Sequence, residues 1–122
     1  MTNYSRGADF ERTVQDDLEG RGYLAFRVAG SHGVADVVAF PPFPGPPWLI
    51  QAKTNGRMSP AERKALSRAA HSYRAVPIKA SRPKRGAILY ERYHGFASAG
   101  YQWSEITPFA SAGDKNSSGG SS

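Results

Sequence analysis

The chain has 122 residues and no cysteine, which excludes disulfides, zinc–thiolate sites and thiol catalysis. This length predicts one domain that buries about two-thirds of the surface of its unfolded chain. The first residues do not resemble a signal peptide, and no stretch reaches the roughly 20 apolar residues of a membrane span. We therefore expect a cytoplasmic protein that makes no contact with a membrane.

The net charge of +6 is distributed unevenly. Residues 1–51 hold four Arg against six acids, a net charge of −2, and residues 93–122 have a net charge of −1. Residues 52–92 hold eleven Lys and Arg against Glu62 and Glu91, a net charge of +9. Basic charge gathered in one segment suits a polyphosphate partner such as nucleic acid. A solvated basic helix and loop is the alternative, and charge alone does not separate the two.

The first predicted element is a helix over residues 6–20 with Ser5 as its N-cap. It has an apolar stripe at spacing four, made by Phe10, Val14 and Leu18. Glu11 lies on the margin of this stripe, so its carboxylate can reach inward toward a sheet. On its own, Glu11 is better explained as a first-turn acid that complements the helix dipole.

Three strands are predicted next, over residues 23–28, 34–40 and 48–53, with a pliable loop at 30–33. The second and third strands are joined by a run of prolines and glycine at 41–47, which cannot continue a regular ladder. Asp36 is a lone carboxylate in an apolar run. Gln51 and Lys53 share one face of the third strand, because side chains alternate along a strand. An acid, an amide oxygen and an ammonium at strand ends suit metal-assisted cleavage of a phosphodiester.

The remaining elements follow from cap and strand signals. Ser59, Pro60 and Glu62 predict a helix with a capping box. Its predicted buried face is formed by Leu66, Ala69, Ala70 and Tyr73, and a basic stripe by Lys64, Arg68 and His71. We expect strands at 76–80 and 87–92 around a basic turn at 81–86, and a last strand near Tyr101, Trp103 and Ile106. A single domain should span residues 1–110, and the Ser/Gly-rich residues 111–122 should be disordered.

Three segments carry a family resemblance: Gly7-Ala8-Asp9-Phe10-Glu11-Arg12, Ala29-Gly30-Ser31-His32-Gly33 followed by Asp36, and Leu49-Ile50-Gln51-Ala52-Lys53. Together they resemble the archaeal-type Holliday junction resolvases of the PD-(D/E)XK nuclease superfamily. The resemblance covers about residues 5–79 and implies an α/β fold with a restriction-endonuclease-like core, a mixed central β-sheet flanked by helices. Two positions depart from the family pattern: Ala35 replaces the usual Pro, and Gln51 replaces the second acid of the Glu-x-Lys signature.

The resemblance also implies roles for individual residues. The catalytic set would be Glu11, Asp36, Gln51, Lys53 and Ser31. Mg²⁺, or Mn²⁺ in its place, would be held by Glu11, Asp36, the amide oxygen of Gln51 and the carbonyl of Ala52. Contacts with DNA would come from a loop and from basic side chains along the chain: Arg27, Ser31, His32, Arg57, Arg63, Lys64, Arg68, Arg82, Lys84 and Arg85.

The expected function is a Mg²⁺-dependent endonuclease of DNA recombination and repair that cuts branched DNA, above all four-way junctions. A two-fold homodimer is implied, because resolving a junction needs paired cuts on opposed strands. One alternative is a nuclease-fold module that binds DNA but cuts it weakly or not at all, because Gln51 removes a charge from the metal site. Another is a nuclease of the same fold that acts on flaps, forks or duplex DNA.

Overall fold

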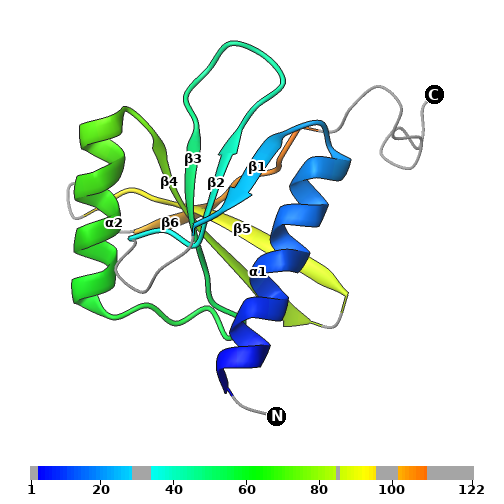
Figure 1. The fold of residues 1–122 in the computed structure, drawn as a ribbon. Helices are drawn as coiled ribbons and strands as arrows, with labels where there is room; N and C mark the ends of the chain where they lie inside the picture. Colours follow the sequence, from blue (N-terminus) through cyan, green and yellow to red (C-terminus); the bar gives the residue numbers. More distant parts are fainter. Residues whose placement is uncertain (1–2, 29–33, 85, 96–101, 110–122) are drawn as a thin grey trace.

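The computed structural model describes residues 3–28, 34–84, 86–95 and 102–109, with side chains from residue 7 onward. These residues form, in chain order, α1 (Asn3–Gly20), β1 (Leu24–Arg27), β2 (Val37–Phe40), β3 (Trp48–Ala52), α2 (Pro60–Tyr73), β4 (Val76–Lys84), β5 (Ala87–Tyr93) and β6 (Trp103–Glu105). The strands lie in one sheet in sequence order, with β3 and β4 parallel and the other neighbours antiparallel. The predicted mixed sheet flanked by helices is confirmed (Figure 1).

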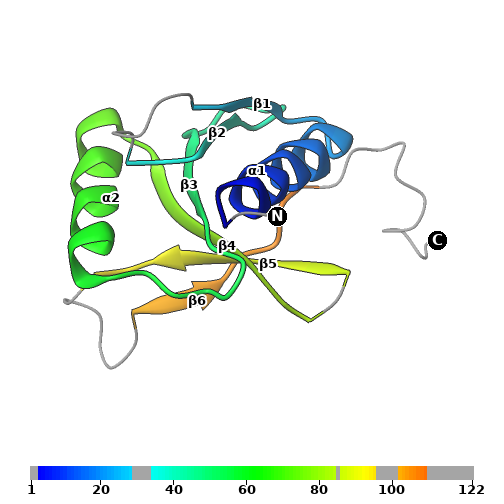
Figure 2. The ribbon, with the colours of Figure 1, turned by 60° about the horizontal axis from the view of Figure 1, so that its bottom comes forward.

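The two helices cover opposite faces of the sheet (Figures 1 and 2). One core cluster joins the apolar stripe of α1 to Trp48, Ile50 and their neighbours on the sheet. A second cluster joins α2 to Leu49, through Leu66 and Ala70. Trp48 and Ile50 therefore point to one face and Leu49 to the other, as alternation along a strand requires.

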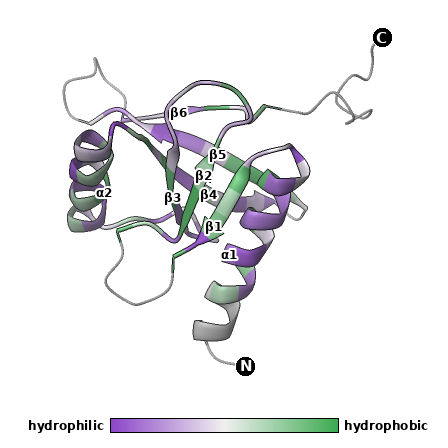
Figure 3. Cartoon of the chain, turned by 45° about the horizontal axis from the view of Figure 1, so that its top comes forward, coloured by the Kyte–Doolittle hydropathy of each residue, from purple (hydrophilic) through white to green (hydrophobic). Residues whose placement is uncertain are grey.

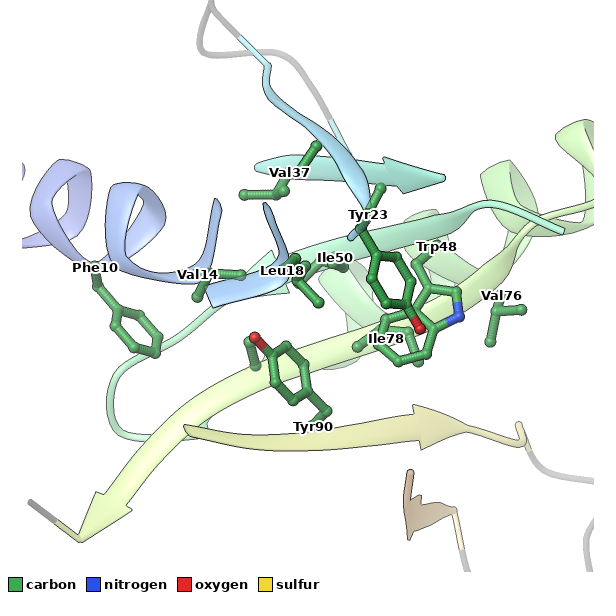
Figure 4. Close-up of a cluster of buried hydrophobic side chains, with 13 residues drawn as sticks. Phe10, Val14, Leu18, Tyr23, Val37, Trp48, Ile50, Val76, Ile78 and Tyr90 are labelled. Atoms are coloured by element: carbon green, nitrogen blue, oxygen red, sulfur yellow. The ribbon is translucent and has the colours of Figure 1, made fainter. Parts of the chain in front are cut away.

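The larger cluster lies beneath α1 (Figure 4). The predicted stripe is confirmed, because Phe10, Val14 and Leu18 are all buried there. Trp48 contacts two tyrosine rings, with centroid distances of 5.5 Å to Tyr23 and 5.9 Å to Tyr90. Ring pairs at these separations add to the stability gained from burial alone.

Two predictions about the helices are wrong. Helix α1 begins at Asn3, so Ser5 lies inside it and is not its N-cap. Neither proline nor another helix-breaking residue separates Asn3 from Ser5, so the helix can begin before the predicted cap. Tyr73 is 73% exposed: it is the last residue of α2, and Arg74 directly after it takes the left-handed conformation that ends the helix. The predicted capping box at Ser59 and Glu62 is confirmed.

The predicted basic turn at 81–86 is also wrong in its extent. Strand β4 continues to Lys84, four residues beyond the predicted end. Ser81 pairs with Leu89 and Lys84 with Ala87, and the register shifts between these two pairs. A shift of this kind accommodates Pro83, which has no N–H to give to the ladder. Of the predicted last strand, Trp103 lies in β6, whereas Tyr101 and the tail from residue 111 lie outside the described residues.

Hydrophobic residues with exposed side chains also lie on β1 and β2, namely Leu24, Phe26 and Phe40. The cartoon in Figure 3 shows β1 largely in the colour of hydrophobic residues. Leu24 and Phe26 alternate with buried Ala25, and the ring of Phe26 lies 6.5 Å from that of Phe40. No helix in the described part of the chain is long and apolar enough to cross a membrane.

Replacing Leu66 by Ala should destabilise the fold by about 2–5 kcal/mol, because a fully buried side chain would leave a cavity between α2 and the sheet. Tyr73→Ala on the same helix should change the free energy of unfolding by less than about 0.5 kcal/mol, because Tyr73 is exposed. Urea unfolding measures both values. Equal losses in the two variants would mean that α2 does not dock through Leu66.

Candidate active site

Asp36 lies in the sheet directly before β2, and its backbone is hydrogen-bonded to the chain on both sides. Its N–H donates to the carbonyl of Ile50 at 2.7 Å, and its own carbonyl accepts the N–H of Val28 at 2.8 Å. These bonds extend the pairing of β1, β2 and β3 by one residue, although β2 itself begins at Val37. The Asp36 side chain accepts the N–H of Ala52 at Oδ2, at 2.8 Å. Its carboxylate is therefore held at the end of β3.

Glu11 reaches Asp36 from α1. Its side chain is 25% exposed and lies 3.8 Å from the Nε atom of Arg27. Burial raises the pKa of Glu11, and the charge of Asp36 raises it further, while Arg27 lowers it. Burial likewise raises the pKa of Asp36, against the N–H of Ala52 and the charge of Lys53, which lower it. Two carboxylates from distant parts of the chain thus share a partly desolvated space.

These oxygens suit a hard divalent cation. A carboxylate pair whose charges repel each other in a partly desolvated site gains from a cation placed between them, and oxygen atoms are the ligands that Mg²⁺ prefers. The described residues contain no group of three or more His, Cys, Asp and Glu side chains suited to a metal ion. Among the described residues, further ligands would therefore be neutral oxygens of the protein, with water completing the shell.

Gln51 is a neutral side chain that could supply such an oxygen beside Asp36. It is buried in β3, and its Nε2 donates to the carbonyl of Val34 at 2.8 Å. Since a carbonyl can only accept a hydrogen bond, the amide nitrogen must face Val34. The amide oxygen is then the atom that could serve a cation. The N–H of Ala52 donates to Asp36. The role of the Ala52 carbonyl as a metal ligand stays a prediction.

Lys53 follows β3 directly, and its main-chain N–H donates to the carbonyl of Ala80 at 2.8 Å. Its Nζ lies 2.6 Å from Oε2 of Glu62, at the start of α2. This contact lowers the pKa of Glu62. The sequence identified Glu62 only as part of a capping box. An acid in the first turn of the helix that follows the strand was the one signal that could have pointed to this pair.

A buried lysine that the sequence analysis did not single out secures the loop after Lys53. The Nζ of Lys79 donates to the carbonyl of Gly56 at 2.8 Å, lies 3.4 Å from Oε1 of Glu91 and sits 4.2 Å from the ring centre of Trp103. Gly56 has a φ of +75°, a conformation that glycine adopts at little cost. The loop between β3 and α2 is therefore anchored to β4, β5 and β6.

The predicted DNA contacts fall into three groups. Four side chains are exposed and free to meet a large anion: Arg57, Lys64, Arg68 and Lys84. Three are partly buried and engaged within the protein: Arg27 beside Glu11, Arg63 bonded to the Met58 carbonyl, and Arg82 over the Phe10 ring. The other three lie outside the described residues: Ser31, His32 and Arg85.

No protein-family model matches the sequence, and no curated protein matches it. Among solved structures, the chain is similar to Hjc, a Holliday junction resolvase from the archaeal hyperthermophile Archaeoglobus fulgidus. The match has a TM-score of 0.62 and 23% sequence identity, and it covers 82% of this chain and 87% of that chain. The resemblance inferred from the sequence is thereby confirmed for the fold: the chain has the fold of Hjc.

Proposed function

We propose that the protein is a metal-dependent endonuclease that cuts branched DNA. One observation carries this proposal: the carboxylate of Asp36 accepts the N–H of Ala52 and lies close to both Glu11 and Lys53. The charge of Lys53 lowers the pKa of Asp36, and the charge of Asp36 raises the pKa of Glu11. These residues come from a helix, a strand start and a strand end. Two carboxylates and one ammonium are the groups that metal-assisted phosphodiester hydrolysis needs.

Each residue has a role in this proposal. Glu11 and Asp36 would hold Mg²⁺ or Mn²⁺, with help from the amide oxygen of Gln51 and the carbonyl of Ala52. Bound there, the cation would supply Lewis-acid polarisation of the phosphate and a more acidic water. Lys53 would orient the attacking water and balance negative charge as it develops. Ser31 and His32 are proposed to contact DNA near the cut.

The substrate part of the proposal rests on the sequence resemblance and on the shared fold. Hjc is described as a Holliday junction resolvase, and four-way junctions are therefore the first substrate that we propose. Two opposed cuts need two equivalent sites, so a two-fold homodimer is part of the same proposal. Analytical ultracentrifugation tests the homodimer by measuring the mass of the protein in solution. Such a protein would work inside the cell, where DNA lies.

Gln51 favours a second candidate function, a DNA-binding module of this fold that cuts weakly or not at all. A neutral amide offsets none of the charge of a cation. A third possibility is cutting of flaps, forks or duplex rather than junctions, since branch selectivity depends on surface shape. Labelled four-way junction, flap, fork and linear duplex, each with and without Mg²⁺ or Mn²⁺, distinguish these functions.

Asp36→Asn should lower the junction cleavage rate by about 100-fold or more, because a charge that holds the cation is lost. The Asn oxygen can still accept the N–H of Ala52, so the fold and DNA binding should persist. Single-turnover cleavage and a binding titration measure the two effects. Asp16→Asn removes an exposed acid of α1 and is the matched control. Normal cutting by Asp36→Asn at saturating Mg²⁺ would contradict the assignment.

Gln51→Glu should lower the Mg²⁺ concentration needed for cleavage, since a carboxylate binds a hard cation more tightly than an amide does. In a module that only binds DNA, the same change is expected to create cutting that the parent lacks. Cleavage rate against Mg²⁺ and Mn²⁺ concentration should be measured for the parent, Gln51→Glu and Gln51→Ala. The same metal dependence in all three would remove Gln51 from the ligand set.

Junction affinity should fall steeply with salt, because Lys and Arg release cations condensed on DNA. Neutralising Lys64 and Arg68, both exposed on α2, should reduce the slope of log K against log salt by about 1.8 if each meets one phosphate. Arg92→Ala on β5, exposed and outside the predicted contacts, is the control. A slope that is unchanged in the double variant would exclude this face of α2 from the DNA contact.

A further inference from the structure

Glu62 belongs to two arrangements at once. Its Oε1 accepts the N–H of Ser59 at 2.9 Å, and its N–H donates to the Ser59 hydroxyl at 3.1 Å, which closes the capping box of α2. Its Oε2 lies 2.6 Å from Nζ of Lys53. The two carboxylate oxygens thus serve different partners, and the cap alone needs only one of them.

The contact with Lys53 is of the strong kind. An N⁺–H···O⁻ bond this short is charge-assisted, and the two residues lie nine positions apart, on a strand end and a helix start. Lysine has a long flexible side chain that does not fix its own ammonium. Glu62, by contrast, is fixed by the first turn of α2. The short contact of Lys53 is with Glu62, while Oδ2 of Asp36 accepts a backbone N–H.

We infer that Glu62 is a positioning residue of the site: it holds the ammonium of Lys53 in place beside Asp36 without occupying the carboxylates that would bind a cation. This inference rests on the proposed nuclease function. Glu62 touches neither substrate nor metal in this account and acts through Lys53.

Two matched variants separate positioning from helix capping. Glu62→Gln keeps an oxygen for the Ser59 N–H but turns an amide N–H₂ toward the Lys53 ammonium, so the cap remains and the ion pair is lost. Ser59→Ala removes the capping hydroxyl but leaves the Ser59 N–H to hold Oε1 and leaves the ion pair intact. Single-turnover cleavage of a four-way junction, junction affinity without divalent metal and thermal unfolding are measured for both.

The junction cleavage rate should fall about 10- to 100-fold in Glu62→Gln, because a misplaced group loses much of its effect. The affinity of Glu62→Gln for the junction should stay within about two-fold of that of the parent, because Glu62 does not contact the DNA in this proposal. Ser59→Ala should cut at the rate of the parent, although its unfolding temperature should be as low as that of Glu62→Gln or lower. Lys53→Ala combined with Glu62→Gln should be no slower than Lys53→Ala alone, since residues that act through one another are not additive.

Failure of this inference differs from failure of the proposed function. A parent that cuts DNA together with a Glu62→Gln variant that cuts at the same rate would overturn the positioning role alone. A parent that cuts no DNA would overturn the nuclease proposal. In that case, NMR relaxation of the Lys53 ammonium still tests the positioning role. The ammonium should be ordered in the parent and in Ser59→Ala, and mobile in Glu62→Gln. Equal mobility in all three proteins would refute the inference.

Discussion

The structure depends on strand β3, which is buried on both faces. Its residues pair with β2 on one side and with β4 on the other, antiparallel and parallel respectively. The same backbone fixes the candidate site: Ile50 accepts the N–H of Asp36, Ala52 donates to the Asp36 carboxylate, and Lys53 donates to the carbonyl of Ala80. A shift of β3 by one residue would exchange its two faces. It would move the core residues and the polar groups together.

Burial of the site explains both its electrostatics and the presence of an amide in it. Desolvation raises the pKa of Glu11 and of Asp36, so these carboxylates are held where their charged forms are costly. A third carboxylate at the buried Gln51 position would add to that cost. An amide that donates to a backbone carbonyl costs less to bury, because its hydrogen-bonding nitrogen is satisfied. The departure from the Glu-x-Lys pattern thus favours stability of the protein without metal.

The segment from β3 to α2 connects the candidate site to the helix that carries Lys64 and Arg68. Lys53 lies at its start and Glu62 near its end, and the two meet at 2.6 Å. Lys79 holds the middle of the segment at Gly56. Two and six residues beyond Glu62 on α2, Lys64 and Arg68 are exposed.

Local patterns in the sequence determined the elements: the stripe of Phe10, Val14 and Leu18, the capping box at Ser59, and short apolar strands around proline-rich turns. These features depend on neighbours within a few residues, so they can be predicted from the sequence. The family resemblance added the fold. The grouping of Asp36 with Ala52, the contact of Lys53 with Glu62, the burial of Lys79 and the extension of β4 to Lys84 were decided by the tertiary structure. Each depends on pairing between segments far apart in the chain, which no local pattern records.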